Sequence, residues 1–319
     1  MIEEAGLRAR LPIPFANRRF GSQAYTSMVH SSSRTRRFLK LFIVRLIAEG
    51  VLTVMSVALA VLLPYLYRKH KTPIQYSLVA DLVFSIALAA AVVGFYAFTV
   101  RWLERRSPTE ALPNWRLSGL GALIGFGLFC SIYGILALLG IASWDGVNGY
   151  DAVIPALIVS LMAGVGEELV FRGVLFRIFE DGFGSTVAMV TTAALFGLLH
   201  AGNPGATPLS TIAIALEAGI LLAAGYAWSR NLWFVFGLHF AWNFTEGGVF
   251  GAPVSGRAMK GILSVPLSAS AHDSVTGGAF GPEASVVAVA VCLSMTVIFA
   301  IAAIRSRRWR ALSFRLVLD

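Results

Sequence analysis

The sequence is poor in charged residues. Of its 319 residues, 13% are charged and 57% are hydrophobic, and the mean hydropathy is +0.74. A soluble globular domain usually carries about 25% charged residues. The deficit leaves too little polar surface to face water, which excludes an ordinary soluble domain. We therefore expect an integral membrane protein.

Cysteine is equally scarce. Only Cys130 and Cys292 are present, each inside an apolar run. This excludes a disulfide framework and a CxxC zinc site. Residues 1–40 also lack the apolar stretch of a cleavable signal peptide. We expect a basic, poorly ordered cytoplasmic arm over residues 1–40 and a basic cytoplasmic tail over residues 305–319.

Long apolar runs occupy most of the chain between the two basic ends. A spanning helix needs about 20 mostly apolar residues, and eight windows meet this requirement. They are Leu41–Tyr67, Leu78–Val100, Leu117–Ala142, Ala152–Phe176, Ser185–Ala201, Leu209–Trp228, Leu232–Phe250 and Ala284–Ile304. The predicted fold class is all-α: a polytopic membrane bundle of about eight transmembrane helices over residues 41–304.

Basic residues predict the orientation of the bundle. The segments on the side of the two termini carry 20 Lys and Arg, whereas the opposite loops carry five. Cytoplasmic loops hold the excess of basic residues, so a multi-pass protein of the cell membrane with both termini cytoplasmic is expected. The basic residues flank apolar runs and do not mix with aromatic residues, so we expect the lipid bilayer as a partner and no nucleic acid.

Ionisable residues inside the windows are the candidates for function, because each costs roughly 2.5–3.5 kcal/mol at mid-bilayer on insertion scales. Arg45 and Glu49 in the first window are four residues apart and predict a local ion pair without a function. Glu217 stands alone in the sixth window, and we leave it outside the catalytic set. The Gly- and Ser-rich segment 251–283 is interpreted as a mobile outer linker in preference to a functional lid.

The fourth window contains two adjacent acids with different surroundings. Glu168 and Arg172 are four residues apart, share a helix face and can form an ion pair. Glu167 points about 100° away from Glu168 and has no countercharge among its helical neighbours. Such a carboxylate is suited to proton transfer, although a hydrogen bond from another helix is the structural alternative.

The fifth and seventh windows supply the remaining polar groups. His200 ends the fifth window, and His239 and Asn243 lie one turn apart in the seventh. At 1.5 Å per residue, Glu167, His200, His239 and Asn243 are all placed near the middle of the membrane. We expect them to meet in one intramembrane chamber.

The ordered motifs Glu167-Glu168-x-x-x-Arg172, Phe196-x-x-x-His200 and His239-x-x-x-Asn243 resemble those of a known family. This is the CAAX prenyl protease and bacteriocin-processing (CPBP, or Abi) family of intramembrane glutamic endopeptidases. The similarity covers a protease-like core at about residues 152–250. Eukaryotic members remove the three residues after a prenylated cysteine, and that substrate is not transferred here.

The resemblance implies catalytic roles without a cofactor. Glu167 and His200 would activate a water for attack on a peptide carbonyl, and His239 and Asn243 would stabilise the oxyanion. Glu168 and Arg172 would form a supporting pair. The implied substrate is a peptide or protein, lipidated or anchored in the membrane.

Two alternatives stay open at this point. Two histidines and one glutamate also form a plausible catalytic zinc set, although no HExxH motif is present. In the second alternative, the polar cluster belongs to a non-catalytic membrane scaffold or to the substrate path of a carrier.

Overall fold

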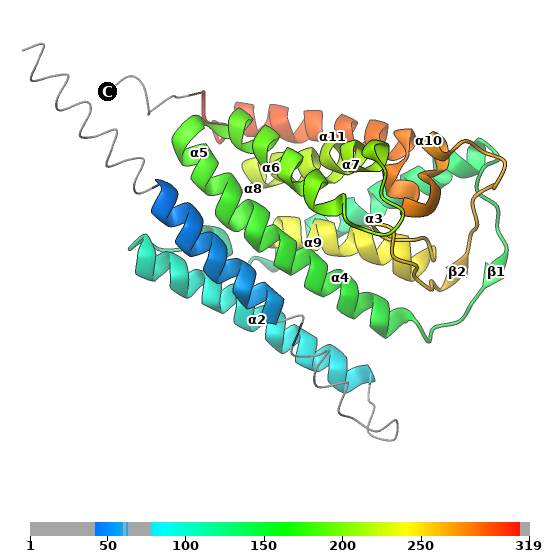
Figure 1. The fold of residues 1–319 in the computed structure, drawn as a ribbon, viewed down its shortest axis with the longest axis horizontal. Helices are drawn as coiled ribbons and strands as arrows, with labels where there is room; N and C mark the ends of the chain where they lie inside the picture. The colour runs from blue at the N-terminus through cyan, green and yellow to red at the C-terminus, as the bar shows by residue number, and fades with distance from the viewer. Residues whose placement is uncertain (1–41, 60–61, 63–77, 313–319) are drawn as a thin grey trace, which may run out of the picture.

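The computed structural model describes residues 42–59, 62 and 78–312, which form an elongated bundle of helices (Figure 1). Within this part of the chain, the strands are β1 (Gly146–Val147) and β2 (Leu263–Ser264), which pair antiparallel. The predicted all-α membrane fold is confirmed. The arm at residues 1–40 and the end of the tail, residues 313–319, lie outside the described residues.

Six helices in the described part are long and apolar enough to cross a membrane. They are Phe42–Leu59, Leu78–Leu103 (α2), Trp115–Leu138 (α3), Val153–Phe183, Pro208–Ser229 and Val286–Arg305 (α11). Two further windows are also helical but differ from these six. The helix α6 (Ser185–His200) has 16 residues, and α9 (Leu232–Asn243) has 12 before it continues as η5 (Phe244–Val249). Polar residues of the candidate site lie on both.

Three helices contain stretches of π-helix. The helix Val153–Phe183 consists of α4 (Val153–Glu168), η3 (Leu169–Phe176) and α5 (Arg177–Phe183), so it runs past the window end at Phe176. The helix Pro208–Ser229 consists of α7 (Pro208–Ile214), η4 (Ala215–Gly219) and α8 (Ile220–Ser229). The third stretch is η5. Such wide turns are rare and occur often at functional sites.

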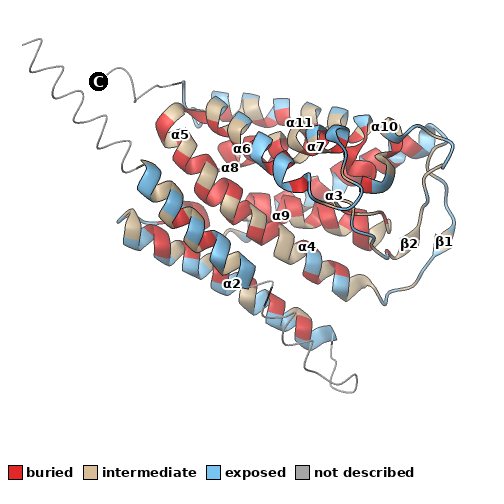
Figure 2. Cartoon of the chain, in the orientation of Figure 1, coloured by how far each residue is buried: buried red, intermediate tan, exposed pale blue. Residues whose placement is uncertain are grey.

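Glycines allow α3 and α9 to pack closely. A Cβ atom on Gly121 would lie far inside van der Waals contact of the Phe234 carbonyl oxygen, and one on Gly237 would do the same to that of Ser118. Small residues permit such close approach between membrane helices. As a result α9 is almost entirely buried at the centre of the bundle, whereas α2 exposes one face (Figure 2).

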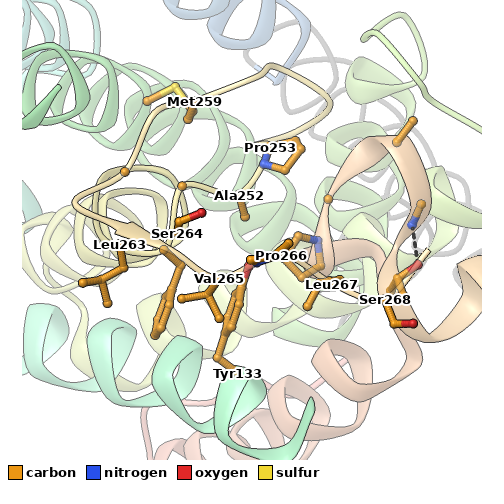
Figure 3. A pocket seen from close by; sticks show the side chains of 18 of the residues that line it. Tyr133, Ala252, Pro253, Met259, Leu263, Ser264, Val265, Pro266, Leu267 and Ser268 are labelled. Carbon is orange, nitrogen blue, oxygen red and sulfur yellow. Dashed lines mark hydrogen bonds between the residues drawn. The ribbon is translucent and has the colours of Figure 1, made fainter. Parts of the chain in front are cut away.

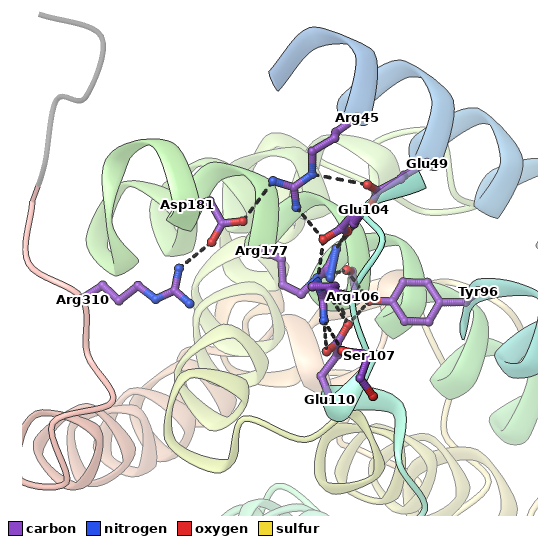
Figure 4. Close-up of polar contacts among 11 residues, drawn as sticks. Arg45, Glu49, Tyr96, Glu104, Arg106, Ser107, Glu110, Arg177, Asp181 and Arg310 are labelled. Carbon is purple, nitrogen blue, oxygen red and sulfur yellow. Dashed lines mark hydrogen bonds and ion pairs between the residues drawn. The ribbon is translucent and has the colours of Figure 1, made fainter. Parts of the chain in front are cut away.

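A network of charged side chains links several helices at one end of the bundle (Figure 4). The predicted pair is present, with Arg45 Nε 3.3 Å from Glu49 Oε1. Arg45 is not confined to this pair, because its guanidinium also lies 3.0 Å from Asp181 and 3.3 Å from Glu104. Asp181 in turn contacts Arg310 at 2.5 Å. The network therefore ties the first helix to α5 and to the segment after α11.

Arg177 of α5 extends the network toward the connection between α2 and α3. Its guanidinium contacts Glu49, Glu104 and Glu110, the last at 2.9 Å. Glu110 also binds Arg106 at 2.7 Å. Burial opposes the charge on Arg106, but hydrogen bonds to Glu110 and Glu104 outweigh it and raise the pKa of this guanidinium. The charges thus hold the end of the helix that carries Glu167 and Glu168.

The segment 251–283 is packed against the helix ends and is more than a simple linker. It contains β2, α10 (Asp273–Thr276), η6 (Gly278–Phe280) and η7 (Pro282–Ala284). It borders a pocket of about 480 Å³ whose wall includes Tyr133 of α3 and the stretch Val265–Leu267 (Figure 3). The ring of Tyr133 stacks on Phe250, with centroids 4.0 Å apart. These contacts were not visible as a pattern in the sequence.

Candidate active site

Glu167 and Glu168 at the end of α4 face different neighbours. Glu168 is fully buried, and it points to α9 and to the guanidinium one turn further on. The Glu167 side chain keeps 29% of its exposure and lies toward the end of α6. This divergence follows from the rotation of about 100° per helical residue.

Glu168 forms the ion pair that the i,i+4 spacing predicts. Arg172 Nη1 donates to Glu168 Oε1 at 2.7 Å, and both side chains are fully buried. Arg172 Nη2 donates to the carbonyl oxygens of Gly219 at 3.0 Å and Ala218 at 3.3 Å, both in η4. The guanidinium carbon also lies 5.1 Å from the centre of the Phe196 ring. Arg172 therefore joins three helices around one buried charge pair.

Glu168 also fixes the ring of His239. His239 Nδ1 lies 2.9 Å from Glu168 Oε1, and because an ionised carboxylate can only accept, Nδ1 carries the hydrogen of this bond. The bond joins α9 to α4, and its two residues are 71 positions apart in the sequence. It leaves His239 Nε2 as the free nitrogen of the ring.

His200 is held in the complementary way. Its Nδ1 donates to the Phe196 carbonyl oxygen at 2.8 Å, because a carbonyl oxygen only accepts. In neutral His200 the lone pair is then on Nε2, which lies 4.0 Å from Glu167 Oε2. This separation is too long for a direct hydrogen bond and suits a bridging water.

A small cavity lies between α6 and α9 beside the two histidines. Its volume is about 20 Å³, and its wall includes His200, His239 and Asn243 together with Ser255, Glu217 and Glu283. A water needs about 10–15 Å³ of such space and two to four polar partners. The cavity therefore has room for one water among polar groups. Glu167 is outside the cavity wall, with its Oε2 4.0 Å from His200 Nε2.

Three buried carboxylates near the cavity were not assigned from sequence. Glu217 is 1% exposed and its Oε1 has no hydrogen-bond partner among the described residues; Glu246 is fully buried, and neither of its oxygens has one. Glu283 accepts a hydrogen bond from the Ser255 backbone N–H at 2.6 Å. Glu246 lies within the seventh apolar window, so its charge was a signal that the sequence reasoning missed. Glu283 lies in the segment interpreted as a linker, where no signal marked it.

The geometry also bears on the zinc alternative. Among residues 42–59, 62 and 78–312, no group of three or more His, Cys, Asp or Glu is placed to hold a metal ion. The Nδ1 atoms of both site histidines are engaged by Glu168 and by the Phe196 carbonyl, which leaves both Nε2 atoms free and does not by itself argue against a metal. Because the described residues are not arranged as a three-ligand site, no catalytic step is derived through zinc.

Comparison with known proteins relates the segment that contains these residues to a known family. Residues 149–245 match the family model of the type II CAAX prenyl endopeptidase, Rce1-like. Searches of curated proteins and of solved structures found no match. The matched segment contains all the motif residues, from Glu167 to Asn243, and its family implies a membrane protease. The match of residues 149–245 to the Rce1-like type II CAAX prenyl endopeptidase model confirms the family resemblance that the three motifs predicted.

Proposed function

We propose that this protein is an intramembrane endopeptidase of the glutamic type, in which Glu167, His200, His239 and Asn243 form the catalytic site. One observation carries the proposal. His200, His239 and Asn243 line a cavity large enough for one water, and Glu167 Oε2 lies 4.0 Å from His200 Nε2. The buried pair Glu168–Arg172 holds together the three helices that carry these residues.

In the proposed mechanism, the first pair activates water. A water that donates one hydrogen to each of two acceptors, over bonds of about 2.8 Å, holds those acceptors about 4.4 Å apart. Glu167 Oε2 and His200 Nε2 are 4.0 Å apart, close to this value. In the attack, the water oxygen bonds to the peptide carbonyl carbon while its proton passes to the Glu167 carboxylate.

In the proposed mechanism, the second pair stabilises the oxyanion. Because His239 Nδ1–H already donates to Glu168, Nε2 can donate only when the ring is an imidazolium. The Glu168 carboxylate supports that cation, and the amide N–H of Asn243, one turn along α9, is the second donor. Donors fixed in a site with little water stabilise a developing negative charge strongly.

The carbon–nitrogen bond then breaks with a proton delivered to the leaving amine. The Glu167 carboxyl group, which received the proton of the water, is the donor, and His200 keeps it in position. The products are one carboxylic acid, which carries the second proton of the water and releases it to the amine or to solvent, and one amine, and Glu167 returns to its ionised form. Because water attacks directly, no acyl-enzyme forms and no serine or cysteine nucleophile is required.

We propose a peptide or protein substrate that is lipidated or anchored in the membrane. His200, His239 and Asn243 are 7%, 6% and 7% exposed, whereas the Glu167 side chain keeps 29%. The scissile bond therefore approaches from the side of Glu167. The distribution of Lys and Arg supports a cell-membrane protein with both termini cytoplasmic.

The test compares cleavage products in membranes of cells that express the wild-type chain or its Glu167→Gln variant. Quantitative sequencing of new protein termini should find fragments that are present in membranes with the wild-type protein and absent from membranes with the Glu167→Gln variant. Asp151→Asn is the matched control, because this exposed acid precedes the same helix. Identical sets of termini in all three membranes, at equal abundance of the protein, would instead favour a scaffold or carrier.

A further inference from the structure

A second cavity lies between α2 and α3, away from the catalytic residues. The helix α2 packs on α4, and α3 packs on α9, whereas α2 and α3 make few contacts with each other. The space between them is a groove of about 710 Å³. Its floor is made by α4 and α9, through Leu161, Val165, Phe236 and Phe240.

The walls of the groove carry small residues. These are Ala89, Ala90, Gly94 and Ala97 on α2 and Gly119 and Ala122 on α3. Both helices are among those long and apolar enough to cross the membrane, so the open side of the groove meets lipid chains. An apolar groove of this volume, within the range of about 300–1,000 Å³ typical of ligand sites, fits a hydrocarbon chain.

One end of the groove is different, because it is closed and positively charged. The connection from Pro108 to Pro113 closes it, held by a hydrogen bond of 3.1 Å from Trp233 Nε1 to the Ala111 carbonyl oxygen. Arg101 is the charged residue in the lining. Its exposed guanidinium makes no hydrogen bond or ion pair with any other residue in the described part of the chain.

We propose that this groove binds one anionic phospholipid, with an acyl chain between α2 and α3 and the headgroup phosphate at Arg101. The apolar walls of the groove match the acyl chain of such a lipid, and the guanidinium of Arg101 at its end matches the phosphate. Arginine is well suited to phosphate because its planar guanidinium can donate two parallel hydrogen bonds. The site is independent of the proposed peptidase reaction and lies behind the helices α4 and α9 that carry it.

Two glycines permit a direct test by filling the groove. A Cβ atom on Gly94 or Gly119 would meet no atom within 4 Å, so Gly94→Leu and Gly119→Leu place a side chain in the groove without a backbone clash. Gly127→Leu is the matched control. Gly127 is also on α3 and also faces open space, but it does not line the groove.

The measurement is native mass spectrometry of the full chain in detergent, with added palmitoyl-oleoyl-phosphatidylglycerol or the zwitterionic palmitoyl-oleoyl-phosphatidylcholine. Wild type and Gly127→Leu should each retain one phosphatidylglycerol per protein. For Gly94→Leu and Gly119→Leu, the affinity for this lipid should fall at least about fivefold, the equivalent of about 1 kcal/mol of binding free energy. Arg101→Gln should bind both lipids equally.

Several results would overturn the proposal. One is equal retention of phosphatidylglycerol by the wild type and by both filled variants. Another is an equal preference of the wild type for the two lipids. A third is binding of a farnesylated peptide in the groove that added phospholipid does not displace, with no phospholipid retained. Because the readout is bound lipid, these results are independent of whether the protein cleaves peptides.

Discussion

The fully buried pair Glu168–Arg172 allows a quantitative prediction. Replacing Arg172 by Met keeps much of the side-chain volume but leaves the Glu168 carboxylate without its 2.7 Å partner. Breaking a buried pair in this way costs about 3–5 kcal/mol. His239 still donates to Glu168 at 2.9 Å, so we expect the lower end, about 3 kcal/mol.

Thermal unfolding of the purified protein in detergent measures this loss. A cost of about 3 kcal/mol should lower Tm by roughly 6–12 °C, at about 2–4 °C per kcal/mol. Arg116→Met is the control, because Arg116 is exposed beside Trp115 and its replacement should cost less than about 0.5 kcal/mol.

A double-mutant cycle separates the pair from its surroundings. Glu168→Gln combined with Arg172→Met removes both charges, so the double variant should lose less stability than the two single variants added together. The expected coupling is about 1–3 kcal/mol. The reasoning is refuted if the single effects add, or if Arg172→Met unfolds at the same temperature as Arg116→Met.

Three further predictions concern packing, metal dependence and the oxyanion site. Gly121→Ala should lower Tm, because overpacking costs about 1–3 kcal/mol and the new Cβ would clash with the Phe234 carbonyl; Gly127→Ala on the same helix has free space and should not. Equal Tm values for the two variants would contradict the close α3–α9 contact. Under the proposal that Glu167 is the base, peptide cleavage should persist in EDTA and 1,10-phenanthroline, whereas stoichiometric bound zinc together with inhibition would contradict this. Asn243→Ala should lower kcat by about 10²–10³ with little change in KM, and a kcat within twofold of wild type would argue against its role.

Local patterns were enough to predict the helices and the pairs within one helix. Apolar windows gave their positions, and the spacing of four residues gave the Glu168–Arg172 and Arg45–Glu49 pairs, both of which the structure confirms. The fourth helix was expected to end at Phe176 or to continue to Glu180, whereas it ends at Phe183, because the π-helical stretch Leu169–Phe176 continues directly into α5. Such a stretch has no hydropathy signal of its own.

Contacts between distant segments were beyond local reasoning. The hydrogen bond from His239 to Glu168 joins positions 71 residues apart, and neither motif alone predicts it. The same holds for Glu283, which reaches the cavity from the segment after η5 because that segment folds back over the helix ends. The catalytic roles carried over from the family resemblance stay predictions until activity is measured.

The most direct measurement is peptide cleavage by the purified full chain in nanodiscs, using an internally quenched peptide that ends in a farnesylated cysteine followed by three residues. A second peptide without the farnesyl group, and membrane-anchored peptides, extend the substrate range. The account predicts that wild type cleaves at least one of them and that Glu167→Gln, with an unchanged Tm, loses at least about 10²-fold in kcat. Cleavage by Glu167→Gln at the wild-type rate would contradict the assignment of Glu167 as the base that activates water.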